Sequence, residues 1–127
     1  MISFSSRGVG HLGCTILPYD GFFGVMGVKY VMGNERIALY GTDVHNPMLA
    51  VCIPYDEQAP SAGNGTMVAF PVPTLSVLHE IYQISEDKGG AKDGAPGPRL
   101  ADSPTHYAYV RDPAGNKLAF YCEDPTA

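Results

Sequence analysis

A short turn near the C-terminus constrains the fold of this chain more than any other segment. Residues 112–118 read Asp-Pro-Ala-Gly-Asn-Lys-Leu and lie between two alternating apolar runs, 106–111 and 117–122. Asp and Pro favour the start of a turn, Gly accepts a positive φ, and Asn hydrogen-bonds to its own backbone. The segment therefore predicts a β-hairpin whose two strands are these runs.

The first half of the chain predicts one helix among four strands. The helix is expected to begin at a capping Thr15, with Pro18 in its first turns, and to end at Gly24 or Gly27. The strands are marked by alternating or continuous apolar residues, and they cover 2–9, 28–32, 36–40 and 48–53.

The second half repeats this order. A strand at 66–70 is followed by a helix that Pro73 and Thr74 open and that Gly89 and Gly90 end. The glycine- and proline-rich stretch 92–99 predicts a loop ordered by turns, with a short edge strand near Leu100 before the hairpin. Each half is thus a β-α-β-β-β unit, which has one half-polar sheet face and cannot bury itself alone.

The predicted organisation is therefore a single α+β domain over residues 1–127, made of two packed modules. Module one covers about 1–58, and module two covers about 65–123. A polar linker rich in small residues covers about 56–64.

Composition excludes several functional classes. The net charge of −5 and the lack of a Lys/Arg cluster argue against nucleic-acid binding. No apolar stretch approaches the ~20 residues of a membrane span, and no secretory signal is recognisable, so we expect a cytoplasmic protein that does not bind membranes. The three cysteines, Cys14, Cys52 and Cys122, are widely spaced and predict neither a disulfide framework nor a Cys-x-x-Cys zinc site.

Three blocks of the second half resemble the vicinal oxygen chelate superfamily, which includes glyoxalase I, bleomycin-resistance proteins, fosfomycin-modifying enzymes and extradiol dioxygenases. Residues 65–70 (Gly-Thr-Met-Val-Ala-Phe) match the family's Gly-x-His-Val-Ala-Phe, and 96–99 (Pro-Gly-Pro-Arg) match Pro-Gly-x-Arg. Residues 112–118 match Asp-Pro-Asp-Gly-Asn-x-Ile. In the first half, 1–4 and 18–27 resemble the family's opening strand and first helix more weakly. The resemblance implies two β-α-β-β-β modules whose mixed sheets curl around a central cleft.

The resemblance also implies a divalent metal held in this cleft by two His and one or two Glu side chains. At the matching positions this chain has Phe4, Met67 and Ala119. A ring and a methyl group cannot ligate a metal, and a thioether suits soft Cu(I) better than Zn, Ni, Mg, Mn or Fe(II). We therefore predict no metal at this place and no cofactor, and a divalent metal only at a non-standard site.

Phe4, Met67 and Ala119 are expected to converge in the cleft and to make its surface largely apolar, so that Phe4 and Met67 are candidate ligand-binding residues. Four residues of the hairpin are expected to line the cleft as well. Alternation places Tyr107 and Tyr109 on one face, and Ala119 and Tyr121 on one face of the partner strand. The loop length leaves the pairing register between the two strands undetermined by one residue. Fosfomycin-modifying enzymes have a cleft tyrosine at the position of Tyr109, so the resemblance favours the register in which all four residues face the cavity. Arg99 and Arg111 are candidate partners for an anionic group.

Three functions remain open from the sequence. The leading hypothesis is a glyoxalase- or bleomycin-resistance-like protein, expected to be a homodimer, that binds a small and largely apolar molecule without metal. The second is a lyase, isomerase or dioxygenase-type enzyme with a displaced metal or acid/base site, for which Tyr109, His45 and Glu123 are candidates. The third is a structural or partner-binding domain with a closed cleft. Fold alone does not choose among them.

Overall fold

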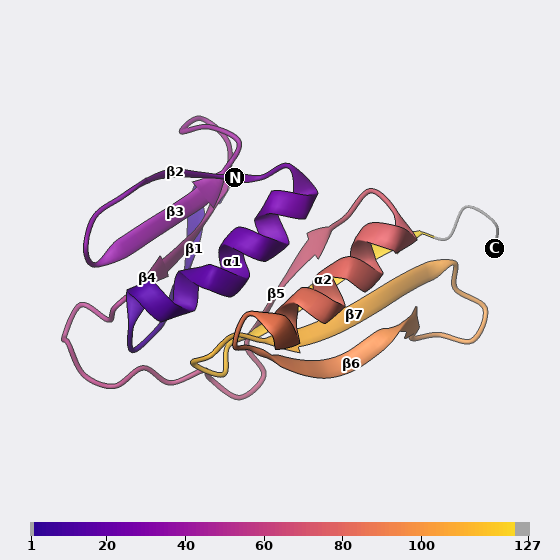
Figure 1. Cartoon of the computed structure of the whole chain (residues 1–127). Coiled ribbons are helices and arrows are strands. Elements are labelled where there is room, and N and C mark those ends of the chain that lie inside the picture. Colours follow the sequence, from indigo (N-terminus) through magenta and orange to yellow (C-terminus); the bar gives the residue numbers. More distant parts are fainter. Residues whose placement is uncertain (1, 124–127) are drawn as a thin grey trace.

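The computed structural model describes residues 2–123 and contains two four-stranded mixed sheets with one helix each (Figure 1). The first sheet has the order β1 (Phe4–Gly8), β4 (Met48–Cys52), β3 (Ile37–Gly41), β2 (Lys29–Gly33). The second has the order β5 (Met67–Pro71), β8 (Lys117–Glu123), β7 (Thr105–Arg111), β6 (Ala91–Pro98). The helices are α1 (Leu12–Met26) and α2 (Leu75–Asp87). The predicted α+β class with two β-α-β-β-β modules is confirmed.

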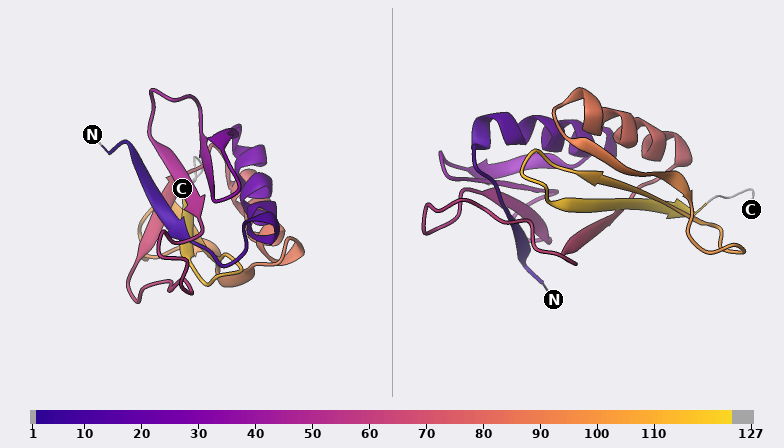
Figure 2. Two further views of the ribbon diagram at one scale, coloured as in Figure 1. Left: turned by 90° about the vertical axis from the view of Figure 1, so that its left-hand side faces the viewer. Right: turned by 90° about the horizontal axis from the view of Figure 1, so that it is seen from below.

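Both helices lie on the same side of the two sheets and pack against each other (Figure 2). Aromatic side chains of α1 fill the core and reach into the second sheet: the ring of Phe22 lies 5.3 Å from Phe120, and that of Phe23 lies 5.5 Å from Phe70. Such pairs contribute about 0.5–1.5 kcal/mol beyond the area that they bury. Module one therefore covers part of the apolar face of module two, as expected for units that cannot bury themselves.

The start of α1 differs from the prediction. His11, not Thr15, is the N-cap, and its Nδ1 atom accepts a hydrogen bond from the amide of Cys14 at 3.3 Å. Thr15 is already in the helix, where its hydroxyl donates to the carbonyl of His11. Pro18 consequently lies inside the helix rather than in its first turn. The end is as expected, because Gly27 adopts the left-handed conformation of a C-cap, with φ 76°.

The prediction of a loop at 92–99 is wrong, and so is the short strand near Leu100. Residues Ala91–Pro98 form β6, which pairs antiparallel with β7, and Leu100 lies beyond it in the turn before β7. An edge strand uses backbone hydrogen bonds on one side only, so it tolerates proline. Shifts of register between Lys92 and Gly94, and again between Gly94 and Gly97, accommodate the glycines as bulges do.

Helix α2 follows its predicted boundaries. Thr74 is the N-cap and accepts a hydrogen bond from the amide of Val77 at 3.1 Å. Its buried side chains, Leu78, Ile81 and Ser85, recur at helical spacing. Among residues 2–123, neither helix has the length and apolar character required to span a bilayer.

Candidate functional site

The candidate site lies on the face of the second sheet that points away from the helices, here called the open face. Strands β7 and β8 pair so that Tyr107 lies opposite Tyr121 and Tyr109 lies opposite Ala119. Their neighbours in sequence, such as Phe120, belong to the core beneath the helices. The expected common face of these four residues is therefore present, and the register is the one that the resemblance favoured.

The three tyrosines form a continuous aromatic surface. The rings of Tyr107 and Tyr109 are stacked, with centroids 6.1 Å apart and planes 12° from parallel. The ring of Tyr107 also lies 5.6 Å from that of Tyr121 on the neighbouring strand. All three side chains are half-buried, while Ala119 between them is fully buried. The surface thus offers flat apolar area, with phenol hydroxyls as polar groups.

Two cations lie against Tyr109. The guanidinium carbon of Arg99 is 4.2 Å from the ring centroid, and Nζ of Lys117 is 4.9 Å from it. Gly94 makes room for this arrangement, because a Cβ atom there would lie 2.9 Å from both Arg99 Nη2 and Tyr109 Cδ2. The aromatic surface therefore continues directly into a positively charged edge.

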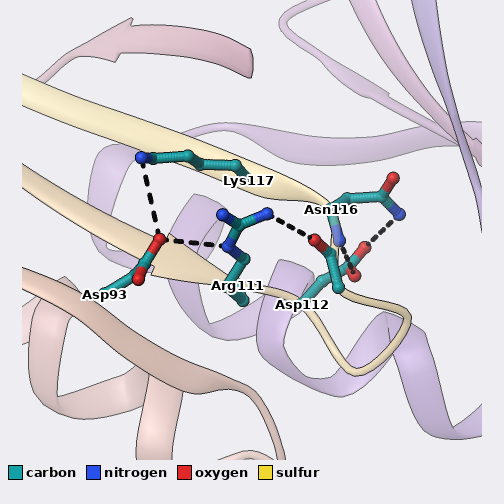
Figure 3. Close-up of polar contacts among 6 residues, drawn as sticks. Asp93, Arg111, Asp112, Asn116 and Lys117 are labelled. Atoms are coloured by element: carbon teal, nitrogen blue, oxygen red, sulfur yellow. Dashed lines mark hydrogen bonds and ion pairs between the residues drawn. The ribbon is translucent and has the colours of Figure 1, made fainter. Parts of the chain in front are cut away.

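Asp93 of β6 connects Arg111 and Lys117 at this edge (Figure 3). Its Oδ2 atom accepts a hydrogen bond from Nε of Arg111 at 3.0 Å and lies 3.7 Å from Nζ of Lys117. Arg111 also donates from Nη1 to the carbonyl of Gly115 at 3.0 Å. These contacts fix the guanidinium plane of Arg111 at the end of the hairpin.

Lys117 and Asp93 were not predicted as site residues from the sequence. Lys117 pairs with Arg111 in the sheet. Strand alternation places Lys117 on the same face as Ala119, so its position on the open face was predictable from the sequence. Asp93 could not be recognised as a site residue because its segment is predicted to be a loop. Only the pairing of β6 with β7 brings it to Arg111.

A pocket of about 260 Å³ opens beside these cations. Arg111 and Lys117 form one wall, and Met67 at the start of β5 lines it as well. The remaining wall is the segment before β5, residues 63–66, in which Gly63 and Gly65 have φ values of 79° and 92°.

The expected convergence of the three positions that match the family's metal ligands is not found, because Phe4 lies apart from Met67 and Ala119. Met67 and Ala119 lie on the open face of the second sheet, where Met67 is 43% exposed and Ala119 is fully buried. Phe4 lies in the first sheet and is 54% exposed, and no Cα atom of β1 is within 8 Å of one in β5 or β8. None of the three side chains carries an oxygen or nitrogen donor, so they do not fit a divalent metal.

Within residues 2–123, no group of three His, Cys, Asp or Glu side chains is placed to hold a metal ion. The candidate acid/base residues are also dispersed. His45 lies in the loop before β4, in a pocket with Ile2 and Ser3, whereas Tyr109 and the exposed Glu123 belong to the second sheet.

Comparison with known proteins identifies the fold. No family model matches the chain, and no curated protein matches it by sequence. A glyoxalase/bleomycin resistance protein from Albidiferax ferrireducens T118 is similar in structure, with a TM-score of 0.84, 24% identity, and coverage of 95% of this chain and 97% of that one. A glyoxalase-related enzyme from Fulvimarina pelagi has a TM-score of 0.73 and 17% identity, with coverage of 95% of this chain and 86% of that one. A putative glyoxalase from Bacillus halodurans has a TM-score of 0.73 and 19% identity, with coverage of 95% of this chain and 94% of that one. The chain has the glyoxalase/bleomycin-resistance fold, consistent with its resemblance to the vicinal oxygen chelate superfamily.

Proposed function

We propose that this protein is a glyoxalase- or bleomycin-resistance-like binding protein that holds a small, largely apolar molecule on its open face without a metal. The stacked Tyr107 and Tyr109, with Tyr121 beside them, carry this proposal. Aromatic side chains with a few polar groups are typical of sites for flat or aliphatic ligands. No element of residues 2–123 covers these rings as the helices cover the opposite face.

The metal-independent part of the proposal is supported by the donor atoms. Lewis-acid catalysis of the kind used by the superfamily requires ligands that fix a cation with an open coordination position. Phe4, Met67 and Ala119 supply only carbon and a thioether sulfur where those ligands would be. Binding through aromatic surface needs no such ion.

We also propose that the protein is a cytoplasmic homodimer. Large apolar side chains are exposed on the faces that point away from the helices, among them Phe4 and Met32 on the first sheet and Met67 on the second. Exposed apolar side chains on these faces favour association with another surface, and a two-fold pair is the commonest soluble oligomer.

A titration with a neutral aromatic probe, 2-naphthalenemethanol, tests the binding function. We expect saturable binding, followed by the chemical shifts of the open-face amides, and loss of binding in Tyr109→Ala. Tyr82→Ala is the matched control, because Tyr82 of α2 also has a lysine cation over its ring, at 5.1 Å, but lies on the helix side. Absence of saturable binding by the native protein, or equal loss in both variants, would contradict the proposal.

A further inference from the structure

We infer that the ligand carries an oxyanionic group, and that this group binds in the pocket between residues 63–66 and the side chains of Arg111 and Lys117. The inference rests on the proposed function, because it assigns the chemistry of the ligand's polar end. Its aromatic body would lie on the tyrosine surface beside Tyr109, and the same lysine that lines the pocket lies against the Tyr109 ring.

The charge distribution supports an anion at this place. The chain as a whole has a net charge of −5, yet the edge of the open face carries three cations and one carboxylate: Arg111 and Lys117 pair with Asp93, and Arg99 lies over the ring of Tyr109 that Lys117 also contacts. The site therefore has a surplus of positive charge in an acidic protein. Such a local field attracts anionic ligands and disfavours cationic ones.

Donor groups remain free at the pocket. Within residues 2–123, Nζ of Lys117 has no hydrogen-bond acceptor, since its carboxylate partner Asp93 is 3.7 Å away. Nη2 of Arg111 likewise makes no hydrogen bond to any of the residues that the structure describes. A carboxylate or phosphate oxygen accepts charge-assisted hydrogen bonds from both kinds of donor.

The shape of the pocket agrees with a small head group. At about 260 Å³ it is smaller than the roughly 300–1,000 Å³ of sites that enclose whole ligands. The walls formed by Gly63 and Gly65 carry no side chain, so an anion can approach the backbone closely there. A larger body must then extend out of the pocket, and the ring of Tyr109 is the adjacent surface.

The test compares probes that share one aromatic body. We expect 2-naphthoate, 2-naphthyl phosphate or both to bind at least about tenfold more tightly than 2-naphthalenemethanol, as a charge-assisted hydrogen bond would give. The order of the two acids identifies the oxyanion. Equal affinity for all three probes would overturn the anion assignment and leave the proposed function intact, whereas binding of none would overturn both.

Two variants locate the anion. Lys117→Gln should remove most of the preference for the acids, while Lys92→Gln should not. Lys92 is a matched control because it also pairs with a carboxylate, Glu86, and lies over a tyrosine ring, but on the helix side. Asp93→Asn should strengthen acid binding, because it removes a competing carboxylate. Equal effects of the two lysine variants, or weaker acid binding in Asp93→Asn, would overturn the inference.

Discussion

The hydroxyl of Tyr19 donates a hydrogen bond of 2.6 Å to Oδ2 of Asp112, and these two residues are 93 positions apart in the sequence. Asp112 also accepts bonds from the amides of Ala114 and Asn116 through Oδ1. The side-chain amide of Asn116 donates both to Asp112 and to the carbonyl of Gly8 in β1. The turn that closes the hairpin therefore also joins module two to module one, and its polar groups are buried in that junction.

The Tyr19 hydroxyl predicts a loss of stability at high pH. Burial, together with the charge of Asp112, raises the pKa of Tyr19 above its ordinary value. Because the folded state retains the proton that the unfolded state loses, this contribution is complete below pH ~10 and declines above it. We expect the free energy of unfolding in urea to fall above pH ~10 by up to about 1.4 kcal/mol per pH unit for this residue.

Tyr19→Phe should make this alkaline decline shallower and should cost about 1.5–3 kcal/mol near neutral pH, because Asp112 loses a donor. Part of the decline in the free energy of unfolding should remain in the variant, because burial and the hydrogen bond to Asp20 also raise the pKa of Tyr40. An unchanged slope in Tyr19→Phe would show that the hydroxyl is not the responsible group.

Two glycines of α1 should respond in opposite directions to alanine. A Cβ atom on Gly21 would lie 2.6 Å from Cγ2 of Ile84 in α2, whereas one on Gly24 meets no atom within 4 Å. Gly24→Ala should stabilise the protein by up to about 1 kcal/mol through helix propensity. Gly21→Ala should destabilise it by about 1–3 kcal/mol, because the helices must move apart. Thermal unfolding of both variants checks this, and stabilisation by both would contradict the close packing of the helices.

Truncation of two aromatic side chains should separate the open face from the core. Phe70 packs against Phe23 and Phe120 beneath the helices, so Phe70→Ala should cost about 3–5 kcal/mol. Tyr109→Ala should cost clearly less, because its ring is half-buried and lies against Tyr107, Arg99 and Lys117 rather than in the core, and yet it should abolish binding of the naphthalene probe. Chemical denaturation of both variants measures the difference. Equal large losses, with no probe bound by the native protein, would indicate a closed face and a structural role.

Calorimetric titration with Zn²⁺, Ni²⁺ and Mn²⁺ should give no tight, stoichiometric binding by the native protein. The physical reason is the missing donor set at Phe4, Met67 and Ala119. Binding at one metal per chain would refute the metal-independent function and would direct attention to a non-standard site.

Sedimentation at micromolar concentration should show a dimer. Phe4→Glu and Met32→Glu should each shift it toward monomer, because they place a charge on the exposed apolar faces. Tyr55→Glu is the control, since Tyr55 is 90% exposed in the segment between β4 and β5. A native protein that sediments only as monomer would remove the dimer proposal without affecting the fold.

The local patterns of the sequence determined most of the elements of this protein. Alternation and turn residues were sufficient for the hairpin of β7 and β8, for its common face of Tyr107 and Tyr109, and for the helices and strands of both modules except β6. These features depend on neighbours in the chain, for which the periods of helix and strand are direct physical signals. The same alternation also places Lys117 on this face, although only Arg99 and Arg111 were predicted as partners for an anionic group.

Only the tertiary structure decided what depends on partners far apart in sequence. A stretch of glycine and proline became β6 because an edge strand needs only the hydrogen bonds offered by β7. That pairing alone brings Asp93 to Arg111 and Lys117, and the packing of α1 on the second sheet alone buries Tyr19 against Asp112. Long-range pairing and burial leave no periodic trace in the chain, because the energy of such contacts comes from residues whose spacing in sequence is arbitrary.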